Sequence, residues 1–156
     1  MQVAAVLGRA NSAVGQGIRY QLGKGGMNPG SPTPAVGNKC DCTGFVAWCL
    51  GFSRKLNDRF YVEFNGGWFE TTAVWTDIGT NVGILEPSNK RSGAIIVYPD
   101  SAGHQGHIGI LIDATHVVHC SKGNDTSTGD AIQITALTVF NQNSKTRVGW
   151  LHGLQP

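Results

Sequence analysis

The chain has 156 residues, which suits one domain and leaves enough length to bury a sizeable core. Hydrophobic residues make up 40% and charged residues 14%, a composition that excludes an intrinsically disordered protein. The formal net charge of +2 comes without a basic arm, which argues against nucleic acid as a partner, and no apolar run approaches the roughly 18 residues of a membrane span.

The start of the chain predicts a helix followed by a long loop. Apolar residues recur at helical intervals over the first 22 residues, so we expect one amphipathic helix that ends near Gly23. Residues 23–39 hold a density of glycine and proline that only a loop accommodates, and so long a loop in a compact domain is usually functional. The first nine residues lack the charged start and apolar stretch of a secretion signal, so we expect no encoded export signal.

A second helix is predicted over residues 42–50, because its apolar residues form one stripe and Gly51 follows as a stop. Residues 54–92 are mixed in pattern and rich in turns. Their aromatic side chains are expected in the core rather than in the wall of a groove. These side chains are Phe60, Tyr61, Phe64, Trp68, Phe69 and Trp75.

From Gly93 onward the pattern becomes that of strands. Because helices come first and strands follow, the order predicts an α+β fold with N-terminal helices packed on an antiparallel sheet. No internal repeat, linker or low-complexity tract interrupts the chain, so a single domain is expected over residues 1–156. The five predicted strands cover residues 94–98, 108–112, 117–120, 131–134 and 147–151.

Cys42 has the features of a catalytic nucleophile. A helix N-terminus stabilises negative charge, so its predicted position would lower the pKa of the thiol. The small residues around it would let a substrate carbonyl approach the backbone amides that bind an oxyanion. The alternative is a buried structural cysteine at a helix cap. The other cysteines are expected as free thiols, with Cys40 the first choice for a regulatory disulfide to Cys42.

A base for this nucleophile is available at the start of a predicted strand. His107 precedes the alternating residues 108–112, and His119 lies on the strand that returns beside it. His119 can orient His107 only if both side chains project to one face of the sheet. Paired residue numbers must then sum to an even value such as 228. We therefore expect a nucleophile on a helix, a base on a strand and an orienting group on its hairpin partner.

Four segments, in order, resemble the NlpC/P60 family of cell-wall cysteine peptidases, and together they span roughly residues 18–122. Residues 20–26 resemble the tyrosine and glycine-rich lead-in of that family, and the nucleophile motif Asp-Cys-Ser-Gly-Phe-Val corresponds to Asp-Cys-Thr-Gly-Phe-Val at residues 41–46. The base strand corresponds to residues 106–110, and the segment with the third polar residue corresponds to residues 118–121.

The resemblance implies a papain-like fold, with Cys42 as nucleophile, His107 as base and His119 as orienting residue. It also implies that Tyr20 lies near the oxyanion and Asp41 near a free amino group of the substrate.

Two positions depart from the family pattern. Thr43, which we also expect at the substrate, replaces the usual serine and keeps its hydroxyl. Ala94 stands where the family has a structural aspartate before the base strand. The second departure weakens the family detail more than it weakens the catalytic assignment.

The expected reaction is therefore attack of the Cys42 thiolate on an amide carbonyl, followed by hydrolysis of the thioester. The resemblance implies the peptide stems of peptidoglycan as substrate and partner, with bonds to D-amino acids, and no cofactor. A related reading keeps the fold but assigns acyl transfer, or cleavage of esters and thioesters, on a substrate outside the wall. A catalytically silent binding module is disfavoured because all three polar groups are present.

Two His-x-x-His pairs also raise the possibility of zinc. His104 lies three residues before His107, and His116 lies three before His119. The spacing suits a helix, but these residues lie in strand-like segments without a Cys-x-x-Cys pair, so we expect no metal. His104 and His116 are expected as solvated residues.

Without an export signal, a wall hydrolase must reach the wall or periplasm by another route. One route is release as a bacteriophage lysis or tail enzyme, and the other is injection as an antibacterial effector, which would have an immunity protein as partner. A monomer is expected. The sequence does not choose between these routes and does not identify the bond that is cut.

Overall fold

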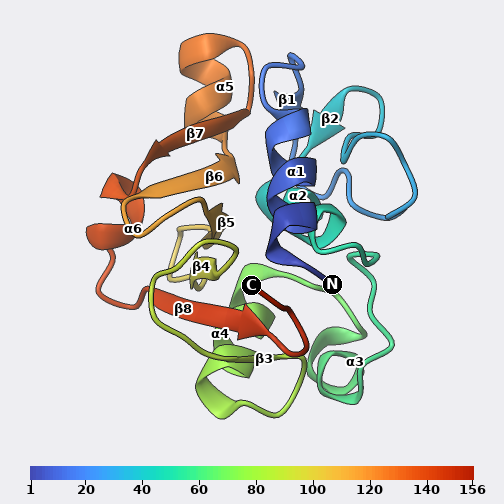
Figure 1. Ribbon diagram of the computed structural model, residues 1–156, viewed down its shortest axis with the longest axis vertical. Helices are drawn as coiled ribbons and strands as arrows, with labels where there is room; N and C mark the ends of the chain where they lie inside the picture. Colours follow the sequence, from blue (N-terminus) through green and yellow to red (C-terminus); the bar gives the residue numbers. More distant parts are fainter.

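A computed structural model describes all residues 1–156 and is built around a six-stranded sheet in which every neighbouring pair of strands is antiparallel (Figure 1). The α+β class predicted from the order of elements is confirmed. Across the sheet the strands follow the order β3 (Leu85–Pro87), β8 (Arg147–Leu151), β4 (Ile95–Tyr98), β5 (His107–Leu111), β6 (His116–Cys120) and β7 (Ile132–Ala136).

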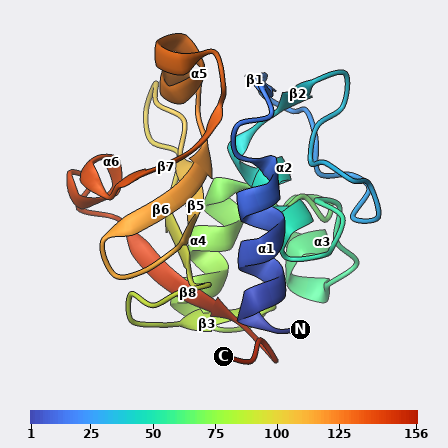
Figure 2. The same cartoon turned by 45° about the horizontal axis from the view of Figure 1, so that its top comes forward.

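The helices and a small second sheet complete the fold. β1 (Arg19–Tyr20) and β2 (Lys39–Cys40) form a parallel pair beside the main sheet. Figure 2 shows the first three helices on one side of the molecule and β6, β7 and β8 on the other. The helices are α1 (Val3–Ala13), α2 (Cys42–Cys49), α3 (Arg59–Asn65), α4 (Thr71–Thr80), α5 (Lys122–Thr128) and α6 (Thr138–Asn141).

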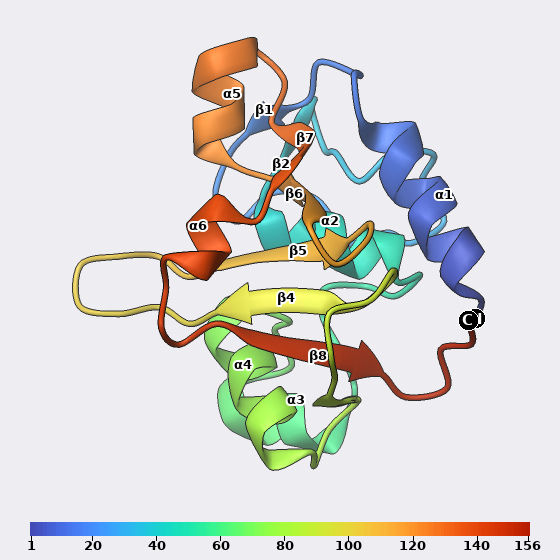
Figure 3. The same cartoon turned by 60° about the vertical axis from the view of Figure 1, so that its left-hand side comes forward.

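The helices pack on the main sheet around one hydrophobic core. α2 lies along β5, and α4 packs on β3, β4 and β8 (Figure 3). One cluster of 35 buried hydrophobic residues runs through these contacts. The two termini meet, because the amide of Val3 donates a hydrogen bond to the carbonyl of Gln155. None of the helices has the length and hydrophobicity that crossing a membrane requires.

The helix α2 is the most buried element, since every residue from Cys42 to Cys49 is buried. Asp41 caps it by accepting a hydrogen bond from the amide of Gly44, so Cys42 is the first helical residue. The loop predicted over residues 23–39 runs directly against this turn. A Cβ on Gly26 would lie 2.3 Å from the carbonyl oxygen of Gly44, so both positions need glycine for the two backbones to touch.

The first helix is shorter than predicted. It ends at Ala13, not near Gly23, and the chain then turns into β1. Gly15 and Gly17 both adopt positive φ, at 77° and 68°, and this conformation cannot continue a right-handed helix. Val14 and Ile18 therefore pack on the core from an irregular segment, whereas Leu22 is exposed.

The other predictions are confirmed in part. The helix over residues 42–50 and the five strands are present, with ends shifted by at most two residues. Three strands, β1 to β3, and four helices, α3 to α6, are not predicted by the pattern. Of the six aromatic side chains, Tyr61 and Phe69 are buried in the core, Phe60 and Trp75 are half-buried, and Phe64 and Trp68 are exposed.

We predict that Gly44→Ala destabilises the protein by about 1–3 kcal/mol, because the new Cβ would lie 2.8 Å from the carbonyl oxygen of Gly25. Urea denaturation gives the unfolding free energy. Gly8→Ala is the matched control, since Gly8 is helical and has no atom within 4 Å of the new Cβ. Equal stability of the Gly44 variant and wild type would contradict the close approach.

Candidate active site

The structure brings the predicted nucleophile and base together from different elements. Cys42 begins α2 and is only 5% exposed, and His107 begins β5, the strand on which α2 packs. The sulfur of Cys42 faces the backbone amide of Ile108, the residue next to His107. The packing of α2 on β5 therefore sets the position of the thiol relative to the imidazole.

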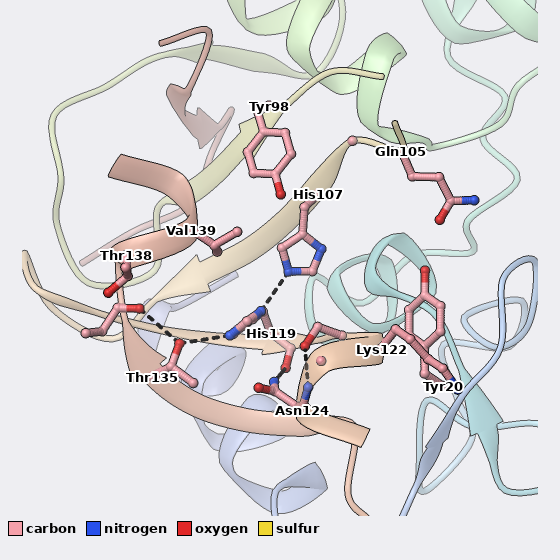
Figure 4. Close-up of a pocket in the computed structure, with 14 residues that line it drawn as sticks. Tyr20, Tyr98, Gln105, His107, His119, Lys122, Asn124, Thr135, Thr138 and Val139 are labelled. Carbon is pink, nitrogen blue, oxygen red and sulfur yellow. Dashed lines mark hydrogen bonds between the residues drawn. The ribbon is translucent and has the colours of Figure 1, made fainter. Parts of the chain in front are cut away.

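The third predicted residue, His119, contacts His107 directly. β5 and β6 pair Ile110 with Val118, so the residue numbers sum to 228 and the predicted register is confirmed. The two histidines share one face, and Nε2 of His107 lies 2.7 Å from Nδ1 of His119 (Figure 4). Gly109 permits this approach, because a Cβ there would lie 3.1 Å from the Cβ of His119.

Aromatic packing fixes the ring of His107. It stacks on Phe140 of α6, with ring centroids 5.3 Å apart and an interplanar angle of 19°. Tyr98 lies beside both rings, with its ring centroid 6.1 Å from that of His107 and 5.6 Å from that of Phe140, and Figure 4 shows it next to His107. Because Nε2 is engaged by His119, Nδ1 is the ring nitrogen that remains to exchange a proton with Cys42.

Burial makes the neutral forms of these groups the stable ones. It lowers the pKa of His107 to about 3, with a further contribution from His119, and it lowers the pKa of His119 to about 4. Burial, with the charge of Asp41 adding, raises the pKa of Cys42 to about 12, although the amides of Thr43 and Ile108 oppose the rise. The expected lowering of the thiol pKa at the helix N-terminus is therefore wrong, because desolvation is the larger effect.

Asp41 lies at the site but is fully engaged within the protein. It is 1% exposed and accepts hydrogen bonds from the amides of Gly23 and Gly44, at 2.7 and 2.8 Å. The buried guanidinium of Arg54 donates to its Oδ2 at 3.0 Å and to the hydroxyl of Thr43 at 2.9 Å. Asp41 and Thr43 therefore hold the start of α2 in place, with Arg54 compensating the buried charge.

Tyr20 reaches the site through the small parallel sheet. It pairs with Cys40, two residues before the nucleophile, and its amide donates to Asp125 at 3.1 Å. Burial raises the pKa of its phenol, and the neighbouring Cys42 raises it further. Tyr20 therefore stays protonated and can donate a hydrogen bond, as the oxyanion role implied by the family resemblance requires.

Two adjoining hollows form a groove across these residues. The larger, of about 470 Å³, is lined by His107, His119 and Lys122, and Figure 4 shows its side chains. The smaller, of about 210 Å³, is lined by Cys42 and by the Asp41–Arg54 pair. Both hollows are bounded by Tyr20, Gln105 and Gly106. A chain-like substrate lying across this boundary would pass over both the thiol and the imidazole.

The remaining histidines lie apart from this chemistry. His104 and His116 are exposed, as expected, and His116 contacts Asp113. Nε2 of His152 lies 3.1 Å from Oδ1 of Asn81. The other three cysteines are buried free thiols: Cys40, Cys49 and Cys120.

The profile of Amidase_5, described as bacteriophage peptidoglycan hydrolase, matches residues 38–147, which is more than half of the chain. The chain belongs to the Amidase_5 family. The matched region of this Amidase_5 protein includes Cys42, His107 and His119, whereas Tyr20 lies before it. The expected class of protein, a peptidoglycan hydrolase, is confirmed.

Curated protein sequences give no match. Among solved structures, the chain is similar to the crystal structure of the NlpC/p60 domain of the peptidoglycan hydrolase SagA. The identity is 17%, the match covers 96% of this chain and 97% of that one, and the TM-score is 0.49.

We predict that Arg54→Met destabilises the protein by about 3–5 kcal/mol, because it leaves the Asp41 carboxylate buried without its positive partner. The double variant Asp41→Asn with Arg54→Met should recover part of the loss. Arg59→Met, which breaks an exposed pair with Glu63, is the control and should cost less than about 0.5 kcal/mol. Similar unfolding free energies for the two arginine variants would show that the buried pair is unimportant.

The lowered histidine pKa values predict a loss of stability in acid. The pKa of His119 falls from 6.5 in the unfolded chain to about 4 in the folded protein. Between these pH values the unfolded chain therefore binds a proton at His119 that the folded chain does not bind. Stability is thus greatest above pH 6.5 and falls as the pH falls toward 4. His119→Asn should reduce the loss between pH 7.5 and 5 by about 1–2 kcal/mol in urea titrations. Parallel pH curves for variant and wild type would contradict the buried neutral state.

Proposed function

We propose that this Amidase_5 protein is a cysteine hydrolase that cleaves amide bonds in the peptide stems of peptidoglycan. Cys42 is the nucleophile, His107 the base and His119 the residue that orients the base. The observation that carries the proposal is the His107–His119 hydrogen bond at the strand start against which the buried Cys42 thiol packs. Family membership supplies the substrate class.

The reaction begins from a neutral thiol and a neutral imidazole. Nδ1 of His107 takes the thiol proton as the sulfur of Cys42 attacks the amide carbonyl and forms a tetrahedral intermediate. Backbone amides at the start of α2 and the phenol of Tyr20 are the candidate donors to its oxyanion. The C–N bond then breaks while His107 returns the proton to the leaving amine. A thioester on Cys42 remains.

Hydrolysis of the thioester completes the cycle. A water molecule enters where the amine has left, and His107 removes its proton as the oxygen attacks the thioester carbonyl. The C–S bond breaks, the acid leaves and the thiol regains its proton. At neutral pH the lowered pKa keeps the imidazole of His107 unprotonated, which is the form that accepts a proton, and the buried cation formed by proton transfer readily donates to the leaving amine.

Each of the two hollows is proposed to bind a different part of the substrate. The leaving amine must lie toward His107, so the part of the stem that it belongs to occupies the larger hollow with Lys122. The acyl part occupies the smaller hollow beside Cys42. Bonds to D-amino acids are the proposed targets, in line with the family resemblance. The proposed active form is a monomer.

The proposed place of action is the bacterial cell wall. The family description favours delivery as part of a bacteriophage over delivery as an injected effector. An immunity protein that covers the groove belongs only to the second route.

We predict that purified protein releases new fragments from peptidoglycan, each with a newly exposed amine, and that Cys42→Ala releases none. Mass spectrometry of the soluble products identifies the bond that is cut. Cys49→Ala is the matched control, because Cys49 is a buried thiol on the same helix and lines neither hollow.

Absence of fragments from wild-type protein would overturn the proposed substrate. Fragments from both wild type and Cys42→Ala would overturn the proposed nucleophile. Circular dichroism of each variant establishes that the fold is retained.

A further inference from the structure

The chain of hydrogen bonds that begins at His107 continues beyond His119 to Thr135 on β7. Nε2 of His119 lies 2.9 Å from the Thr135 hydroxyl, which donates to the carbonyl of Ala136 at 3.0 Å. Figure 4 shows Thr135, His119 and His107 joined in this order. Thr135 was not among the residues singled out from the sequence.

The sheet register explains how Thr135 reaches His119. β6 and β7 pair His119 with Gln133, so Thr135 lies two residues beyond the partner and on the same face. Diagonal neighbours of this kind are within reach of a long side chain such as histidine. Thr135 is half-buried and lines the larger hollow behind the two rings.

The direction of each hydrogen bond follows from the last acceptor. A hydroxyl has one proton, and a carbonyl oxygen can only accept. Because the Thr135 proton is directed to Ala136, the hydroxyl oxygen must accept from His119, which therefore carries its proton on Nε2. Nδ1 of neutral His119 is then an acceptor, so the proton in the 2.7 Å contact belongs to Nε2 of His107.

This chain of hydrogen bonds determines the protonation of Nδ1 of His107, the nitrogen that exchanges a proton with Cys42. With its proton on Nε2, neutral His107 has an unprotonated Nδ1, which is the form that a base needs. If the Thr135 hydroxyl turned to donate to His119, every bond in the chain would reverse. Nδ1 of His107 would then carry a proton and could not accept one from Cys42. The carbonyl of Ala136 favours the productive direction because it holds the hydroxyl proton.

We infer that Thr135 is a positioning residue that sets the tautomers of His119 and His107, so that Nδ1 of His107 is available as the base. This inference rests on the proposed function for the role of His107, but the tautomers themselves exist without substrate. The chain of hydrogen bonds thus runs from His107 through His119 and Thr135 to the carbonyl of Ala136, and this carbonyl sets its direction.

The test combines Thr135→Val, which keeps the shape but removes the hydroxyl, with Thr135→Ser, which keeps the hydroxyl. Long-range 1H–15N correlation spectra of 15N-histidine protein report the tautomer of each ring at pH 7.5, with assignments from His107→Gln and His119→Gln. In wild type we expect both rings protonated on Nε2. In Thr135→Val we expect the Nδ1-protonated form to rise in both rings, and in Thr135→Ser a return to the wild-type spectrum.

Activity on peptidoglycan fragments should follow the spectra. We expect kcat to fall about 10-fold or more in Thr135→Val with KM changed less than about 2-fold, and to recover in Thr135→Ser. Thr126→Val is the matched control, because Thr126 is exposed on α5 and lines neither hollow. If Thr135→Val does not fold, Thr135→Ala replaces it in both measurements.

Two results would overturn the inference: wild-type His119 protonated on Nδ1, or unchanged tautomers when the hydroxyl is removed. Because the spectra need no substrate, they remain decisive if the protein does not hydrolyse peptidoglycan. Failure of the proposed function and failure of the Thr135 inference are therefore distinguishable.

Discussion

The arrangement of the site depends on the buried start of α2 against β5. Asp41 caps this helix, and the cap places Cys42 at the first helical position, where its sulfur faces the amide of Ile108. A carboxylate that is 1% exposed would be costly alone, and the buried guanidinium of Arg54 compensates it. The glycine contacts of the loop over residues 23–39 close the other side of this turn. The position of the nucleophile thus follows from packing and one buried ion pair.

The same burial determines the protonation state of the catalytic residues. Desolvation raises the pKa of the Cys42 thiol and lowers the pKa of both histidines, so the resting groups are neutral. Neutral groups can still be oriented, because each hydrogen bond has a direction. The stacking of His107 on Phe140 and its bond to His119 hold the ring, and the Thr135 hydroxyl and a carbonyl end the chain.

Much of the site could be predicted from the sequence because its signals are local. The apolar stripe after Cys42 marks the helix, the alternation after His107 marks the strand, and the short return to His119 leaves few registers for the hairpin. The positive-φ glycines that end α1 were weaker signals, since glycine at positions 15 and 17 is compatible with a loosened helix.

The features of the site that could not be predicted depend on contacts between segments that are distant in the chain. Arg54 has no local motif, and its role appears only when the loop before Cys42 folds against α2. The raised thiol pKa is likewise a consequence of burial that no short motif encodes. Thr135 lies one residue beyond the strand predicted over residues 131–134, and its partner depends on how β7 pairs with β6.

The central claim is that Cys42 acts as a nucleophile only with His107 as its base. The most direct measurement uses a stem-peptide analogue with an electrophilic carbon in place of the scissile carbonyl. Intact-protein mass spectrometry and peptide mapping then locate the label in wild type and in His107→Gln. The account predicts one label, on Cys42 alone, formed in wild type and at least about 100-fold more slowly in the variant. A label on another residue, or equal rates in the two proteins, would contradict it.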